Sequence, residues 1–85
     1  MNHTLFDRMT DDQLISCAER QLEKFNRAWL LVMGTHYKSG AHIDASVAME
    51  RAYKALGELQ RYIYSNRPAA VHDRFCAAAN WQERC

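Results

Sequence analysis

Apolar residues recur at alternating spacings of three and four along two long stretches of the chain, and this periodicity constrains the fold more than any other feature. The recurring residues are Ile15, Ala18, Leu22, Phe25, Trp29 and Val32 in the first stretch, and Ala45, Met49, Ala52, Leu56, Leu59 and Ile63 in the second. Such spacing places the residues on one side of a helix that packs lengthwise against a neighbour. We therefore expect a long antiparallel helical hairpin.

Residues that start and stop helices set the expected bounds of the first helix. Thr10 and Gln13 match a capping box, in which each side chain accepts a hydrogen bond from the other residue's backbone N–H. Ser39 and Gly40 are typical of the chain beyond a helix end. These signals predict a first helix over about residues 10–37.

The second helix and a third, shorter helix are indicated by a cap and a proline. Asp44 is a good N-cap, and Pro68 disfavours helical backbone at the residue before it, so we expect the second helix over about residues 44–66. Pro68 also suits the first position of a helix, which predicts a third helix over about residues 68–83. The apolar stripe of that third helix consists of Val71, Phe75, Ala78 and Trp81.

The composition agrees with an all-α fold. The 85 residues include three glycines and one proline, far fewer turn residues than a β-sandwich or a barrel requires. Apolar residues make up 48% of the chain, which is enough for a core, and the length suits one domain. We expect a single helical domain over residues 1–85, in which residues 1–9 form an N-terminal arm or a short helical turn.

One pattern resembles a single helical pair of the tetratricopeptide type. It consists of Leu30-x-x-Met33-Gly34-x-x-Tyr37 followed by Ala48-x-x-x-Ala52-x-x-Ala55-Leu56, and it covers roughly 27 residues. In such repeats the small residues lie where the paired helices cross. No second repeat is visible in the sequence, so the resemblance implies close packing of two helices and not membership of that family.

Three features bear on where the protein is located. The longest apolar run, residues 28–33, is far too short to span a bilayer. The first residues lack the positive charge and the apolar stretch of a signal peptide. The three cysteines are an odd number, which is typical of reduced thiols. We expect a cytoplasmic protein that does not contact membranes.

Motifs for metal binding and catalysis are incomplete. His72 and Cys76 are four residues apart and would share one face of the third helix, but a zinc site needs two further ligands. Whether this pair binds a metal stays open. The sequence has no glycine-rich phosphate loop, no nucleophile elbow and no context for a catalytic triad. We expect a non-catalytic protein without a cofactor.

The strongest functional signal is the stretch 28–33, which is apolar on every side of a helix. A helical hairpin covers about one stripe of each helix, so Leu30, Leu31 or Met33 must contact something else. Either the third helix or another chain covers them. The residue types enriched in interface hot spots extend the candidate set to Trp29, Leu30, Leu31, Met33, Tyr37, Tyr62, Tyr64 and Trp81.

These residues predict an adaptor, inhibitor or regulator that acts by binding another protein. They also favour a homodimer, because two hairpins can combine into a four-helix bundle. The alternative is a nucleic-acid-associated regulator whose contacts are Arg51, Lys54, Arg61 and Arg67. Acidic residues in the same region nearly cancel these charges, and the chain's net charge of +1 is not that of a dedicated nucleic-acid binder.

Overall fold

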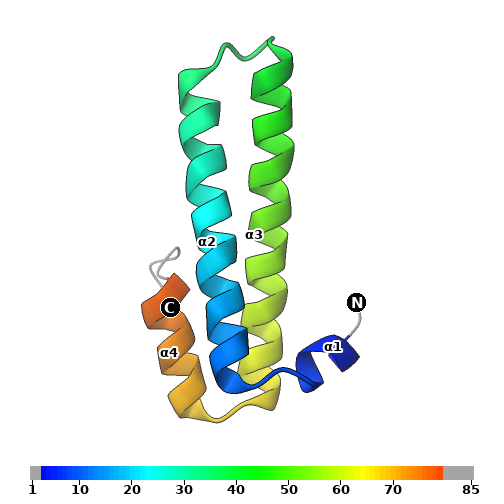
Figure 1. Cartoon of the computed structure of the whole chain (residues 1–85), viewed down its shortest axis with the longest axis vertical. Coiled ribbons are helices and arrows are strands. Elements are labelled where there is room, and N and C mark those ends of the chain that lie inside the picture. The colour runs from blue at the N-terminus through cyan, green and yellow to red at the C-terminus, as the bar shows by residue number, and fades with distance from the viewer. Residues whose placement is uncertain (1–2, 80–85) are drawn as a thin grey trace.

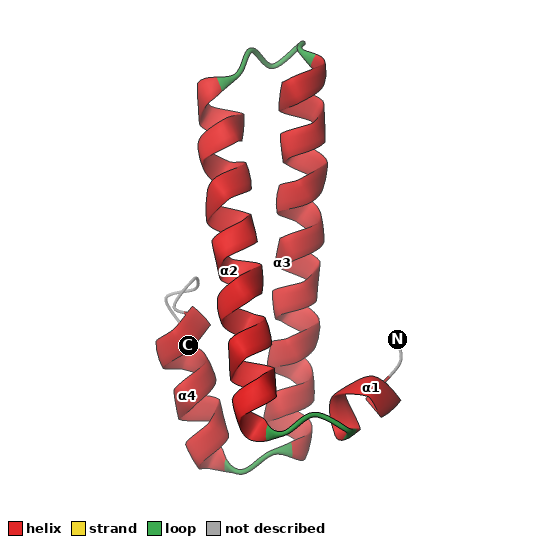
Figure 2. Cartoon of the chain, viewed as in Figure 1, coloured by secondary structure: helices red, strands yellow, loops and turns green. Residues whose placement is uncertain are grey.

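The computed structural model describes residues 3–79 of the chain. These residues form the helices α1 (His3–Asp7), α2 (Asp11–Gly34), α3 (Gly40–Asn66) and α4 (Ala69–Ala79), and no strand occurs among them. Figure 1 shows α2 and α3 side by side and antiparallel over their whole length, with α1 and α4 at the end opposite the α2–α3 loop; Figure 2 marks the connecting loops. The predicted all-α hairpin with a short C-terminal helix is confirmed.

The capping box at the start of α2 is present as predicted. The Gln13 N–H donates to the Thr10 hydroxyl oxygen over 3.1 Å, and the Thr10 N–H donates to the Gln13 side-chain carbonyl over 2.8 Å. The helix ends at Gly34, three residues before the expected end. There the backbone of Thr35 turns extended and its hydroxyl donates to the Leu31 carbonyl over 2.7 Å, which satisfies one of the last free carbonyls of the helix.

The predicted start of the second long helix is wrong. The helix α3 begins at Gly40, four residues before Asp44, because Ser39 is the N-cap. The Ser39 hydroxyl accepts a hydrogen bond from the His42 N–H over 3.1 Å, and a serine is as good a cap as an aspartate. The predicted end at Asn66 is correct. The described part of α4 begins one residue after Pro68, and the predicted end of that helix near residue 83 lies outside the described residues.

The large buried side chains gather at the base of the hairpin, where α4 packs. The core cluster consists of Leu14, Ile15, Ala18, Leu56, Leu59, Tyr62, Ile63, Val71, Phe75 and Ala79. Phe75 of α4 is fully buried in this cluster, so α4 completes the core of the base. The stripe predicted for the third helix is thus used as expected at Val71 and Phe75.

The other half of the hairpin has a much thinner core. We call residues 24–34 of α2 and 40–53 of α3 the loop-end half; its buried residues are the three alanines Ala28, Ala45 and Ala52. Trp29, which the periodicity places on the helix–helix seam, is instead 47% exposed, and Phe25 is partly buried. Because small residues form this seam, the two helices bury little apolar area here without further contacts.

Candidate interaction surfaces

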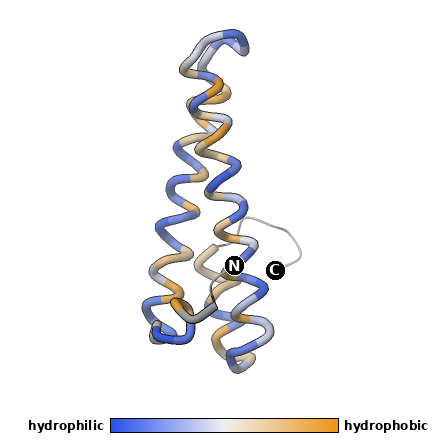
Figure 3. Tube along the Cα trace, turned by 90° about the vertical axis from the view of Figure 1, so that its right-hand side faces the viewer, coloured by the Kyte–Doolittle hydropathy of each residue, from blue (hydrophilic) through white to orange (hydrophobic). Residues whose placement is uncertain are grey.

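The predicted interface residues of α2 are exposed in the loop-end half. Leu30 is 69% exposed and Met33 is 68% exposed, and Trp29 and Leu31 are exposed as well. Tyr37, in the loop that follows, is also exposed, with its ring stacked on His36. Figure 3 shows hydrophobic residues near the loop as well as at the base.

The sequence left two possible covers for these residues, the third helix or another chain, and the structure shows where the described part of the third helix lies. Over its described residues, α4 lies beside the base of the hairpin, and its buried side chains belong to the core cluster there. Leu30, Leu31 and Met33 lie toward the opposite end of α2 and keep more than half of their surface exposed. The described part of α4 therefore leaves this apolar surface uncovered.

Sequence reasoning missed the contribution of α3 to the same half. Ile43, Val47 and Tyr53 are exposed there, and none of them was a predicted interface residue. Because the second helix was expected to begin at Asp44, Ile43 was assigned to the loop and not to a helix face. Once α3 begins at Gly40, Ile43 and Val47 are four residues apart on one helix face, and this spacing could have revealed them.

One side of the loop-end half is aromatic. Phe25, Trp29 and Met33 are spaced by four residues along α2 and therefore form one stripe. Across the helix pair, the ring of Tyr53 on α3 lies 6.4 Å from the ring of Phe25, measured between centroids. We call these four residues, Phe25, Trp29, Met33 and Tyr53, the aromatic face.

The other side of the loop-end half is a groove between α2 and α3. Leu31 lines it, and because residues two apart on a helix point about 200° apart, it lies opposite Trp29 and Met33. The groove has a volume of about 770 Å³, and its apolar lining is largely alanine, from Ala28 on α2 and from Ala41, Ala45, Ala48, Ala52 and Ala55 on α3. Its charged lining residues are Lys24, Arg27, Asp44 and Arg51.

Two of the predicted interface tyrosines lie at the base and not in the loop-end half. Tyr62, although a candidate interface residue, is buried, with 2% of its surface exposed. Its ring lies 5.2 Å from that of Phe6, and its hydroxyl donates to Asp7 over 2.6 Å. The N-terminal segment, expected as an arm or a short helical turn, contains the five-residue helix α1, and Phe6 of this helix packs against the Tyr62 ring. Tyr64 is exposed but stacks on His72 of α4. Trp81 lies outside the described residues.

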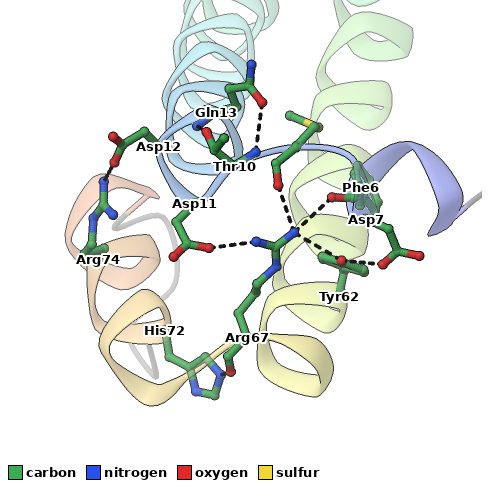
Figure 4. Close-up of polar contacts among 11 residues, drawn as sticks. Phe6, Asp7, Thr10, Asp11, Asp12, Gln13, Tyr62, Arg67, His72 and Arg74 are labelled. Atoms are coloured by element: carbon green, nitrogen blue, oxygen red, sulfur yellow. Dashed lines mark hydrogen bonds and ion pairs between the residues drawn. The ribbon is translucent and has the colours of Figure 1, made fainter.

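Arg67, a predicted nucleic-acid contact, is held inside a polar cluster at the base (Figure 4). Its guanidinium donates to the Asp11 carboxylate over 2.7 Å, to the carbonyls of Met9 and Phe6 over 2.9 and 3.1 Å, and to the Tyr62 hydroxyl over 3.3 Å. The hydrogen bond to Tyr62 is the main cause that raises the pKa of Arg67 above its ordinary value; burial opposes the rise, and Asp11 adds to it. Arg67 therefore ties the base together and has little surface to offer a phosphate.

The other three predicted nucleic-acid contacts are exposed on α3. Arg51 lines the groove, Lys54 forms an ion pair of 3.1 Å with Glu50, and Arg61 lies nearer the base. Their spacings of three and seven residues place them along one side of the helix. The three cations therefore remain exposed along one side of α3, but Lys54 is already paired with Glu50.

The His72 and Cys76 side chains contact other groups of the base. The His72 Nε2 atom is 2.8 Å from the Arg67 carbonyl oxygen, and the Cys76 Sγ atom is 3.0 Å from the Tyr64 hydroxyl. Among residues 3–79, no group of three or more histidine, cysteine or acidic side chains comes together as a metal site. No helix in the same range has the length and the apolar character needed to cross a bilayer.

Comparison of the chain with protein-family models, with curated proteins and with solved structures gives no match.

Proposed function

We propose that this protein is a small non-catalytic binding module that acts through the loop-end half of its hairpin, as an adaptor, inhibitor or regulator. One observation carries the proposal: most of the large apolar side chains of this half are exposed, while the described part of α4 packs on the core at the other end. Exposed side chains of this kind, concentrated on one part of a surface, are typical of a protein–protein interface.

A second copy of the chain is the first partner to test. The aromatic face presents Trp29, Met33 and Tyr53, which are residue types enriched in interfaces. Two hairpins that pack through this face would bury the same surface on both copies, as a two-fold dimer requires, and would form a four-helix core in the half where one chain buries only alanines.

A reducing cytoplasm remains the predicted compartment.

Sedimentation equilibrium tests this proposal. The full chain should approach twice 9.9 kDa as its concentration rises from about 1 to about 200 µM. Replacing Met33 by Asp should return it to the monomer, because a carboxylate would be buried without a partner. The matched control is Leu5→Asp, since Leu5 is an exposed apolar residue on α1, away from the aromatic face. A wild-type monomer over the whole range, or a dimer that Met33→Asp leaves intact, would contradict self-association through this face.

The alternative function, nucleic-acid binding, rests on the exposed cations of α3. Arg51, Lys54 and Arg61 lie along one side of the helix and could follow a phosphate backbone. Binding through them should weaken steeply with added salt, and neutralising all three should abolish it while leaving the dimer in place. A titration of a fluorescent oligonucleotide at two salt concentrations separates this function from protein binding.

A further inference from the structure

The groove on the side of Leu31 is long enough for a helix and is separate from the aromatic face. Its α3 wall extends from Ala41 to Ala55, which corresponds to about 21 Å at a rise of 1.5 Å per residue. The alanines that line it lack bulk, so side chains from a partner can approach the backbones of α2 and α3 closely. Leu31, more than half exposed, adds a large apolar contact to the α2 wall.

Charges along the groove specify what can enter it. Lys24 and Arg27 stand on the α2 wall and Arg51 stands on the α3 wall, against one carboxylate, Asp44. Arg20 extends the α2 row by one further turn, because it lies four residues before Lys24, and both line the same adjacent hollow. Glu23 pairs with Arg27, but both side chains are largely exposed, so this pair offsets the positive field weakly.

This charge pattern disfavours a second copy of the chain as the occupant. Groove-to-groove packing of two copies would bring together two sets of Lys24, Arg27 and Arg51 with only one Asp44 for each set. Like charges placed opposite each other across an interface repel and oppose association. A partner that brings carboxylates to both walls would instead form favourable charge pairs with Lys24, Arg27 and Arg51.

We propose that the groove binds an amphipathic helix from another protein, whose large apolar residues lie on the alanine floor and whose flanking Asp and Glu residues pair with Lys24, Arg27 and Arg51. An apolar helix face laid into a groove, with anchors spaced by three and four residues, is an established mode of peptide recognition. This surface is additional to the self-association of the aromatic face and does not depend on it.

A displayed library of helical peptides of about 18 residues, randomised at the apolar face and at its flanks, provides the probe. Selection against the full chain should enrich peptides with leucine-type anchors flanked by acidic residues. Fluorescence anisotropy of a selected peptide should show a Kd that rises about tenfold or more for Ala48→Phe, which fills the groove from an exposed position. The matched control is Ala77→Phe on α4, also exposed and outside the groove, which should bind like wild type.

A second pair of variants tests the charges. Arg51→Glu should weaken the acidic peptide about tenfold or more, whereas Arg61→Glu, on the same helix but outside the groove, should change the Kd much less. No enriched peptide, enrichment of basic flanks, or binding that Ala48→Phe leaves unchanged would overturn the proposal. Loss of the dimer in Ala48→Phe would overturn it too, because it would identify a second copy as the occupant. If the groove variants lose the peptide and keep the dimer, both proposals hold. If the wild-type chain forms no dimer but the groove variants still lose the peptide, the groove proposal holds without self-association.

Discussion

The Arg67 guanidinium and the Asp11 carboxylate form an ion pair of 2.7 Å between residues that are 56 positions apart in the sequence. Asp11 opens α2, and Arg67 follows the last residue of α3. The pair therefore joins the first residue of α2 to the residue after α3, and the bonds from Arg67 to the carbonyls of Phe6 and Met9 attach α1 and the segment after it as well. One side chain thus holds three segments of the base in place.

Replacement of Arg67 by Ala should destabilise the fold by about 2–3 kcal/mol, because it removes the charge-assisted hydrogen bonds to the Asp11 carboxylate and to the carbonyls of Phe6 and Met9. A urea melt followed by circular dichroism measures the loss. Arg61→Ala, at an exposed site on α3, should stay within about 0.5 kcal/mol of wild type. Equal effects of the two substitutions would show that Arg67 does not hold the base together.

Loss of the Tyr62 hydroxyl should have a smaller effect at the same place. Tyr62→Phe keeps the buried ring but removes the donor to Asp7 and an acceptor for Arg67, so we expect a loss of about 1–2 kcal/mol. Tyr37→Phe, at an exposed loop tyrosine, should leave the stability unchanged. Thermal melts of both variants at low protein concentration provide the comparison.

The two halves of the hairpin should respond differently to the same truncation. Leu56→Ala empties a site in the core of the base and should cost about 2–5 kcal/mol, enough to unfold much of the population of so small a domain. Leu31→Ala, in the groove wall, should cost less than about 1 kcal/mol in the unbound chain. Similar losses at the two sites would mean that Leu31 is covered in solution.

The helix caps allow the corrected start of α3 to be tested. Thr10→Ala and Ser39→Ala should each cost about 1 kcal/mol, since each hydroxyl accepts from a free N–H of a first turn. Asp44→Ala should have little effect, because Asp44 lies inside α3 and caps nothing. If urea melts showed a larger loss of unfolding free energy for Asp44→Ala than for Ser39→Ala, the helix would begin at Asp44, as the sequence predicts.

Local signals in the sequence were sufficient for the secondary structure and the hairpin. The three-and-four periodicity, the Thr10–Gln13 capping box and Pro68 act within a few residues of where they stand, so their outcome does not depend on distant contacts. Two of the helix bounds that the structure describes differ from the prediction by three or more residues, the end of α2 and the start of α3. At the start of α3, Ser39 and Asp44 are both good caps, and the sequence offers no means of ranking them.

Tertiary packing decided the rest. Periodicity treats every seam position alike, yet Leu56 is fully buried and Trp29 is half exposed, because α4 packs on the base and its described residues stop short of the loop-end half. Tyr62 is likewise buried because α1, whose Asp7 is 55 positions away in the sequence, packs against it through Phe6 and Asp7. Periodicity along a helix identifies the side that faces inward, whereas the depth of burial depends on which other segments pack there, and this only the folded chain determines.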